Sequence, residues 1–258
     1  MSAVLTSAGD LRLLVTRNLR RETRLIDGLI VNIALPVIIM VLFVYVFGGA
    51  ITTGSSKLDY VDFVVPAVLL MAGGYGAALT AVSISEDMTG GMIDRFRTLP
   101  VGGWAVPAGH VVASVVRNVT TCGFALIAAL LMGFRPDASP VDWLLVLAVV
   151  AGYVLAMSSL SVLWGLLVGS PQAAGAFSFF VLFLPYLSNG VVPAETMPEA
   201  LRGFAHHQPI TPIVDTLRSL LLDQPMGSSG ALAAAWLTGI VVVSAPVAAL
   251  LFRRRTSA

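Results

Sequence analysis

Long apolar runs separated by short polar segments dominate the chain between residues 28 and 252. A helix needs about 20 mostly apolar residues to cross a hydrocarbon core of roughly 30 Å. The pattern therefore predicts six transmembrane helices, of which the fifth is the shortest. The predicted spans are residues 28–47, 64–83, 111–134, 143–168, 173–187 and 232–252.

The composition agrees with this pattern. Of 258 residues, 57% are hydrophobic and only 11% are charged, whereas soluble domains usually carry about 25% charged residues. We expect a single all-α integral membrane domain over residues 1–258. Cys122 is the only cysteine, so an intrachain disulfide is impossible.

Arginine distribution predicts the orientation, because cytoplasmic segments retain Lys and Arg during insertion. Arginines gather before the first span, between the second and third spans, and after the sixth. They are Arg12, Arg17, Arg20, Arg21, Arg24, Arg95, Arg97, Arg253, Arg254 and Arg255. The opposite side has fewer basic residues and more acids. We therefore expect both termini to be cytoplasmic.

An amphipathic segment precedes the first span, at residues 10–27. One helical face carries Leu11, Leu14, Val15, Leu19, Leu25 and Ile26, and the opposite face carries Arg17, Arg20 and Arg24. This pattern is typical of an interfacial helix that lies flat on the inner leaflet. The alternative is a basic flank that only sets the topology.

A second irregular segment, residues 86–99, connects spans two and three. Met92, Ile93, Phe96 and Leu99 recur at helical spacing, and Asp94, Arg95 and Arg97 lie on the other side. Pro100 ends the segment. A short helix of this kind suits docking into a groove of a soluble partner. The alternative is a solvated connector.

The third irregular segment, residues 188–230, is too long for a turn and too polar to span. Thr196 and Glu199 have capping-box spacing, with Pro198 between them, and Thr211 before Pro212 indicates a second helix. We expect an interfacial or re-entrant helical hairpin on the outer side.

Several kinds of chemistry are missing. A Walker A loop ends in Lys followed by Ser or Thr, but the only lysine, Lys57, precedes Leu58. No predicted span contains Asp, Glu or His, which disfavours an ion-coupled carrier and an intramembrane enzyme. Neither a G-x-S-x-G elbow nor an H-E-x-x-H pair occurs, and we predict no metal site and no catalytic residue.

Polar residues within the spans are the candidates for a translocation path. Arg117 is the one charge in a span, and it either lines the path or snorkels to the inner headgroups. Asn32, Ser158 and Ser159 are the other candidates. Glycines in the second span, and the Gly165–Gly169 pair, more often mark close helix packing than a ligand site.

Two segments resemble a known family. The segment EDMTGGMIDRFRTLPV, residues 86–101, resembles the element after the second span in membrane subunits of type-two ABC exporters. The segment LSNGVVPAETMPEALRGFAHHQPITPIVDTLRSLL, residues 187–221, is similar to the region between spans five and six in the daunorubicin-resistance permease branch. The six-span layout extends the resemblance over the whole chain.

The resemblance implies a role for each segment. Residues 10–27 would be a connecting helix, residues 86–99 a coupling helix that docks on a separate ATPase subunit, and residues 188–230 a hairpin that helps to close the exit. The expected docking residues are Glu86, Met92, Asp94, Arg95, Phe96 and Arg97.

The resemblance also implies the partners and the location. They are an ABC ATPase (nucleotide-binding) subunit, a second permease subunit that is identical or related, and membrane lipid, with no nucleic acid. No cofactor is expected in this chain, because the partner ATPase would bind ATP and Mg. We expect a bacterial inner (plasma) membrane protein that exports amphipathic drug-like molecules or lipids. The alternatives are a polysaccharide or polymer exporter of similar fold and an ion-coupled carrier.

Overall fold

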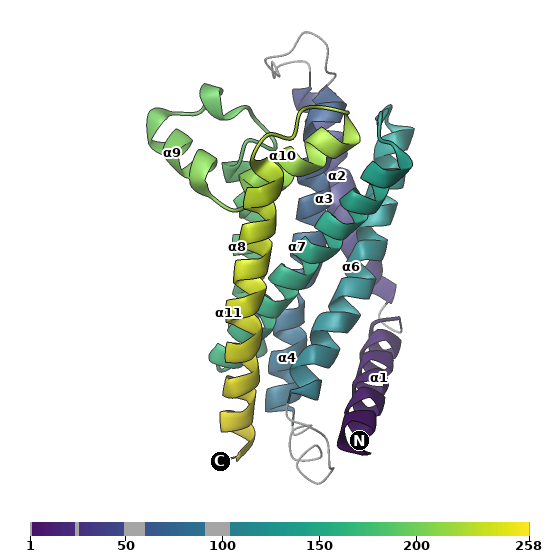
Figure 1. Ribbon diagram of the computed structural model, residues 1–258, viewed down its shortest axis with the longest axis vertical. Helices are drawn as coiled ribbons and strands as arrows, with labels where there is room; N and C mark the ends of the chain where they lie inside the picture. Colours follow the sequence, from purple (N-terminus) through teal and green to yellow (C-terminus); the bar gives the residue numbers. More distant parts are fainter. Residues whose placement is uncertain (1, 24–25, 49–59, 91–103, 258) are drawn as a thin grey trace.

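The structure is an elongated bundle of helices with no strand among the residues that it describes. It is a computed structural model that describes residues 2–23, 26–48, 60–90 and 104–257. The start of α1 and the end of α11 lie at one end of the bundle, whereas α9 and α10 lie at the other (Figure 1). We call these ends the terminal end and the hairpin end.

The helices follow the predicted order. They are α1 (Ser2–Thr23), α2 (Ile26–Val41), the π-helix η1 (Leu42–Phe47), α3 (Tyr60–Ala78), α4 (Thr80–Thr89), α6 (Ala105–Leu131), α7 (Pro140–Leu167), α8 (Pro171–Phe183), the 3-10 helices η2 (Leu184–Leu187) and η3 (Ala194–Thr196), α9 (Glu199–His207), α10 (Ile210–Leu221) and α11 (Ser229–Ser257).

Among the described residues, five helical segments are long and apolar enough to cross a membrane. They are Ile30–Phe47, Tyr60–Thr89, Ala105–Leu131, Pro140–Leu167 and Ser229–Arg255. The fifth predicted span corresponds to the shorter apolar helix Pro171–Leu187, which runs from the terminal end back toward the hairpin end (Figure 1). The all-α membrane fold is confirmed, although the second span is longer than predicted and includes Glu86 and Asp87.

Local capping explains where two helices begin. Ser139 precedes Pro140 and forms a capping box with Asp142: the Ser139 hydroxyl accepts from the Asp142 amide, and the Asp142 carboxylate accepts from the Ser139 amide. Ser170 caps the start of α8: it too directly precedes a proline, and its hydroxyl accepts from the Ala173 amide.

The predicted capping box at Thr196 is wrong. The Thr196 hydroxyl donates to the carbonyl of Pro193, 2.7 Å away, within η3. α9 begins after Pro198 without a side-chain cap. Thr196 and Glu199 do have the spacing of a capping box. However, the chain before α9 forms a 3-10 turn, so the Thr196 hydroxyl bonds to an earlier carbonyl and does not cap α9.

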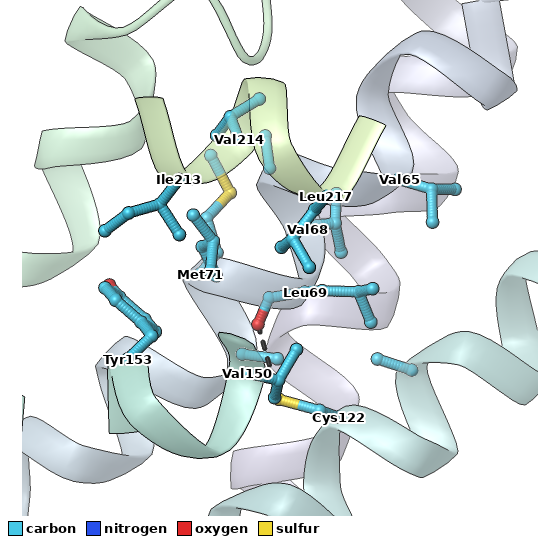
Figure 2. Packing of buried hydrophobic residues seen from close by; sticks show 14 of the residues in the cluster. Val65, Val68, Leu69, Met71, Cys122, Val150, Tyr153, Ile213, Val214 and Leu217 are labelled. Carbon is cyan, nitrogen blue, oxygen red and sulfur yellow. Dashed lines mark hydrogen bonds between the residues drawn. The ribbon is translucent and has the colours of Figure 1, made fainter. Parts of the chain in front are cut away.

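Helix α3 is the centre of the core, and most of its side chains are buried. Figure 2 shows Leu69 and Met71 of α3 packed among Cys122 of α6, Tyr153 of α7 and Ile213 of α10. The Cys122 thiol donates to the Leu69 carbonyl, 3.4 Å away. Many large apolar side chains on the outer surface of the bundle stay exposed, as expected for a surface in contact with lipid.

Glycines permit the closest helix contacts. A Cβ atom on Gly165 would collide with the carbonyl oxygen of Ala81 and lie 2.5 Å from Cγ2 of Ile84, so α7 and α4 touch backbone to backbone there. A Cβ atom on Gly73 would lie 2.9 Å from the side chain of Val154 on α7. By contrast, a Cβ atom on Gly169 would meet nothing within 4 Å. Only the first glycine of the Gly165–Gly169 pair therefore lies at a helix interface.

This difference predicts the stability of two alanine variants. Gly165→Ala should lower the free energy of unfolding by about 1–3 kcal/mol, because overpacking forces α4 and α7 apart. Gly169→Ala, four residues later, should leave it nearly unchanged. The midpoint of thermal unfolding in detergent measures both, and equal midpoints would show that the glycine contact does not limit packing.

Candidate functional site

A buried carboxylate joins three helices at the terminal end of the bundle. Asp87, near the end of α4, is only 5% exposed. Arg17 of α1 approaches it with two parallel hydrogen bonds, from Nη1 to Oδ2 and from Nη2 to Oδ1, both 3.1 Å. Nε2 of His110, at the start of α6, lies 3.1 Å from Oδ2. Two-pronged arginine pairing of this kind fixes geometry as well as charge.

Arg21, one helical turn after Arg17, extends this cluster. Its Nη1 donates to Oδ1 of Asp87 at 3.3 Å, and its Nη2 donates to Oε2 of Glu86 at 2.5 Å. We call Arg17, Arg21, Glu86, Asp87 and His110 the ionic cluster. It ties the end of α4 to α1 and α6, at the start of residues 86–99, the segment predicted to be the coupling helix.

The structure describes only one of the six predicted docking residues, Glu86. Glu86 is 44% exposed, but the structure pairs it with Arg21 of α1. The other five docking residues lie outside the described residues: Met92, Asp94, Arg95, Phe96 and Arg97. Asp87 was not among the predicted docking residues, although it lies only three residues before the Gly90–Gly91 pair in the sequence.

The N-terminal helix has one contact that its amphipathic pattern did not predict. Arg17, expected on the polar face, pairs with Asp87 inside the bundle. α1 runs along the terminal end of α6 (Figure 1), with Leu14 buried against Gly109, while Leu13 is 72% exposed. The inner face of α1 is thus mixed, because the Asp87 carboxylate must be neutralised there.

A network of buried polar side chains lies deeper in the bundle. The Ser114 hydroxyl of α6 lies 2.8 Å from those of Thr80 and Ser158, which come from α4 and α7. The Asn118 amide donates to Ser114 at 3.0 Å, and the Asn32 amide of α2 donates to Asn118 at 3.3 Å. We call these five residues the polar network. Because Ser114 accepts from Thr80 and Asn118, its own proton goes to Ser158.

Arg117 adjoins this network and does not snorkel toward the terminal end. Its Nη2 donates to the carbonyl of Gly76 at 2.7 Å and lies 3.5 Å from the Thr80 hydroxyl. Gly76 is required here, since a Cβ atom would collide with the Asn118 amide and lie 2.8 Å from the Asn32 nitrogen. The structure thus brings three of the four predicted path residues, Asn32, Arg117 and Ser158, to one region.

Ser159, the fourth predicted path residue, lies outside the network. It is buried, and its hydroxyl donates to the Leu155 carbonyl of its own helix at 2.8 Å. Sequence reasoning missed Ser114 and Thr80. A signal for Ser114 was present, because His110, Ser114 and Asn118 follow one another at intervals of four and therefore share one face of α6.

A cavity of about 220 Å³ separates the ionic cluster from the polar network. Its walls include Asn18, Arg21, Asn32, Glu86, His110 and Arg117. Pockets for drug-sized ligands usually have about 300–1,000 Å³. This cavity can therefore admit a small polar group or one end of a longer molecule. The described residues hold no cluster of His, Cys, Asp or Glu that could bind a metal ion.

A second cavity, of about 320 Å³, lies toward the hairpin end between α7, α8, α9 and α11. Phe177, Phe180 and Phe204 line it, with His207 and Gln208 as polar groups. Phe177 stacks on Phe180 with ring centroids 6.1 Å apart. The two cavities differ in chemistry: one is lined by charged and amide groups, and the other by aromatic rings.

The hairpin end has a polar cluster of its own, centred on Arg218 of α10. Its guanidinium donates to Asp215 at 3.0 Å, to the carbonyl of Phe63 on α3 at 3.2 Å and to that of Asn189 at 3.2 Å. It also lies 4.2 Å from the centre of the Phe63 ring. Burial raises the pKa of the Asp215 carboxyl, against the opposing effects of Asn189 and Arg218. This cluster holds α10 on the core.

Comparison with known proteins fits this arrangement. The family model described as "ABC-2 type transporter" matches residues 10–222. The chain belongs to the ABC-2 type transporter family. This family and the apolar helices together make it a multi-pass membrane protein, a permease subunit of an ABC transporter.

Two relatives within the ABC-2 type family carry more specific names. The chain is 29% identical over 231 residues to the "Daunorubicin resistance ABC transporter permease protein DrrB1" of Streptomyces coeruleorubidus, covering 87% of this chain and 79% of the relative. It is 24% identical over 255 residues to the "Probable doxorubicin resistance ABC transporter permease protein DrrC" of Mycobacterium tuberculosis, covering 95% and 91%.

The ionic cluster predicts unequal effects for two adjacent acids. Asp87→Asn should lower the free energy of unfolding by about 3 kcal/mol, because it leaves two arginines facing a neutral buried group. Glu86→Gln, which removes a half-exposed pair, should cost about 0–1 kcal/mol. Thermal unfolding in detergent compares the two variants. Equal losses would show that Asp87 does not organise the cluster.

Proposed function

We propose that this permease exports amphipathic drug-like molecules in complex with a separate ATPase subunit. The observation that carries the proposal is the ionic cluster. It joins α1 and α6 to the end of α4, at the start of residues 86–99, the predicted docking segment. A push on that segment is thereby passed to three helices at once rather than absorbed by a loose connector.

The relatives' names support the class of substrate. Both relatives are named for resistance to a drug, daunorubicin or doxorubicin, and both are named as ABC transporter permeases. The two cavities support an amphipathic substrate, because one offers charged and amide groups and the other offers stacked aromatic rings. A substrate that passed from the 220 Å³ cavity to the 320 Å³ cavity would move from the terminal end toward the hairpin end.

The energy source is proposed to lie in the partner. The sequence lacks a Walker A loop, since its only lysine is followed by leucine. The ATPase subunit would therefore bind ATP and Mg, and this chain would be non-catalytic. We further propose that a second permease subunit completes the transporter and that both termini are cytoplasmic, so that the terminal end meets the ATPase.

The docking step is tested by co-purification with the ATPase subunit in detergent. Reversing Arg95 and Arg97 to glutamate should reduce the bound ATPase by about tenfold or more, the factor expected when charge-assisted contacts of an interface are lost. The matched control reverses Arg254 and Arg255, two arginines at the same end of the bundle, and should keep the complex.

Two outcomes would contradict this proposal. If the Arg95 and Arg97 reversal retains the ATPase as well as the control does, residues 86–99 are not the docking segment. If wild-type protein binds no ATPase and, when reconstituted alone, moves solute down an imposed ion gradient, the chain is an ion-coupled carrier.

The polar network predicts a transport phenotype for one of two buried serines on α7. Ser158→Ala removes the bond to Ser114 and should lower the export rate by about threefold to tenfold, the equivalent of one neutral hydrogen bond. Ser161→Ala is the control, because that hydroxyl donates only to the Met157 carbonyl of its own helix among the described contacts. The rate of drug efflux from vesicles, normalised to the amount of assembled complex, is measured for both variants. Equal rates in the two variants would show that the polar network does not contribute to transport.

A further inference from the structure

Two buried amide oxygens belong to residues that line the 220 Å³ cavity and have no hydrogen-bond partner among the described residues. They are Oδ1 of Asn18 on α1 and Oδ1 of Asn32 on α2. The two residues are only 5% and 3% exposed. Buried acceptors of this kind are costly when unpaired and are normally satisfied by protein, water or a ligand. The cavity is the space from which a ligand could satisfy both.

The orientation of the Asn32 amide is fixed by its neighbours. The side-chain nitrogen of Asn118 donates to the backbone carbonyl of Ser114 at 2.8 Å, and a carbonyl can only accept. The Asn118 oxygen is therefore the acceptor for the Asn32 nitrogen, 3.3 Å away. Turning the Asn32 amide over would bring two oxygens together. The atom of Asn32 that remains for a ligand is therefore an acceptor.

The remaining polar walls of the cavity disfavour a charged ligand group. Arg21 and Arg117 bring two guanidinium groups that oppose a cation, and the Glu86 carboxylate is already paired with Arg21. The two amide oxygens oppose an anion, because they carry partial negative charge and donate nothing. An uncharged group with its own O–H can donate to both oxygens and meets neither repulsion.

The cavity is accessible from one side. The side chains of Arg21 and Glu86 are 39% and 44% exposed, so the wall that they form reaches the protein surface. The volume of about 220 Å³ is below that of a pocket for a whole drug-sized molecule. A ligand can therefore place its polar end in the cavity while its apolar part stays outside.

We propose that this cavity binds the uncharged, hydroxyl-bearing head of an amphipathic substrate, such as a sugar, with Asn18 and Asn32 as the acceptors for its hydroxyl groups. This inference rests on the proposed function and names the part of the substrate that the terminal end of the permease recognises. Asn32 has two roles in it, because its nitrogen bonds to the polar network and its oxygen to the substrate.

The test measures binding of four fluorescent probes to the assembled transporter in lipid nanodiscs without ATP. The probes share one alkyl chain and differ in the head: glucose, glucose with every hydroxyl methylated, an ammonium group and a carboxylate. Methylation removes all donors from the sugar and keeps its ring. Nanodiscs without protein correct for partition of each probe into lipid.

Wild type should bind the glucoside more tightly than each of the other three probes. The preference for the glucoside is the Kd of the methylated probe divided by that of the glucoside. It should be about tenfold to a hundredfold in wild type, the factor expected for two neutral hydrogen bonds. Asn18→Leu and Asn32→Leu should each lower this preference by about threefold to tenfold, and the double variant should abolish it.

Asn189→Leu is the matched control. Its Oδ1 is also buried without a partner among the described residues, but Asn189 belongs to the Arg218 cluster at the hairpin end. This variant should keep the wild-type preference, because a loss of packing weakens binding of both sugar probes alike. If Asn32→Leu prevents assembly by disrupting the polar network, Asn18→Leu decides the matter.

Three results would overturn the proposal. The first is a preference that is equal in wild type and Asn18→Leu, which would mean that the oxygens hold only water. The second is tighter binding of the ammonium or carboxylate probe than of the glucoside, and the third is no binding of any probe. ATP-driven export of the glucoside from vesicles separates this site from the proposed function. If the glucoside binds as expected but no probe or drug is exported, the proposed function fails and the site stands.

If export occurs but the preference does not depend on Asn18 or Asn32, the site fails and the proposed function stands.

Discussion

The rest of the structure depends on the need to neutralise the Asp87 carboxylate where water does not reach it. An unpaired charge in such a place is so costly that its partners must come from wherever the fold can supply them. Here they come from α1 and α6, helices that are distant from α4 along the chain. Satisfying one carboxylate therefore sets the relative position of three helices at the terminal end of the bundle.

The same constraint governs the interior of the bundle. Buried hydroxyls and amides have no lipid or water partner, so they bond to one another, as Asn32, Ser114 and Ser158 do. The Gly76 carbonyl of α3 accepts a hydrogen bond from Arg117 of α6. At the hairpin end, the Arg218 guanidinium donates hydrogen bonds to Asp215 and to two backbone carbonyls. Each polar cluster thus joins helices that hydrophobic packing alone would leave free to rotate or slide.

Several features were accessible from the sequence because they depend on local chemistry. Apolar length predicted the spans, and the arginine distribution predicted one basic end, where the start of α1 and the end of α11 lie together (Figure 1). Asp215 and Arg218, three residues apart in the segment that resembles the permease branch, form an ion pair in the structure. The capping box at Thr196 failed because spacing along the chain does not reveal a preceding 3-10 turn. Helical periodicity did not reveal the pairing of Arg17 with Asp87, since it measures hydrophobicity and not the charge of a neighbouring helix.

By itself, the sequence determined that this protein is an all-α membrane protein and which segments are long and apolar enough to cross a membrane. Those properties follow from the cost of transferring each side chain and each backbone group between water and hydrocarbon, a cost that is local. Only the tertiary structure decided which polar residues work together. Whether Arg117 snorkels or bonds to Gly76, and whether Ser158 or Ser159 joins the network, depends on the rotation of each helix about its axis. That rotation is settled by contacts between distant segments.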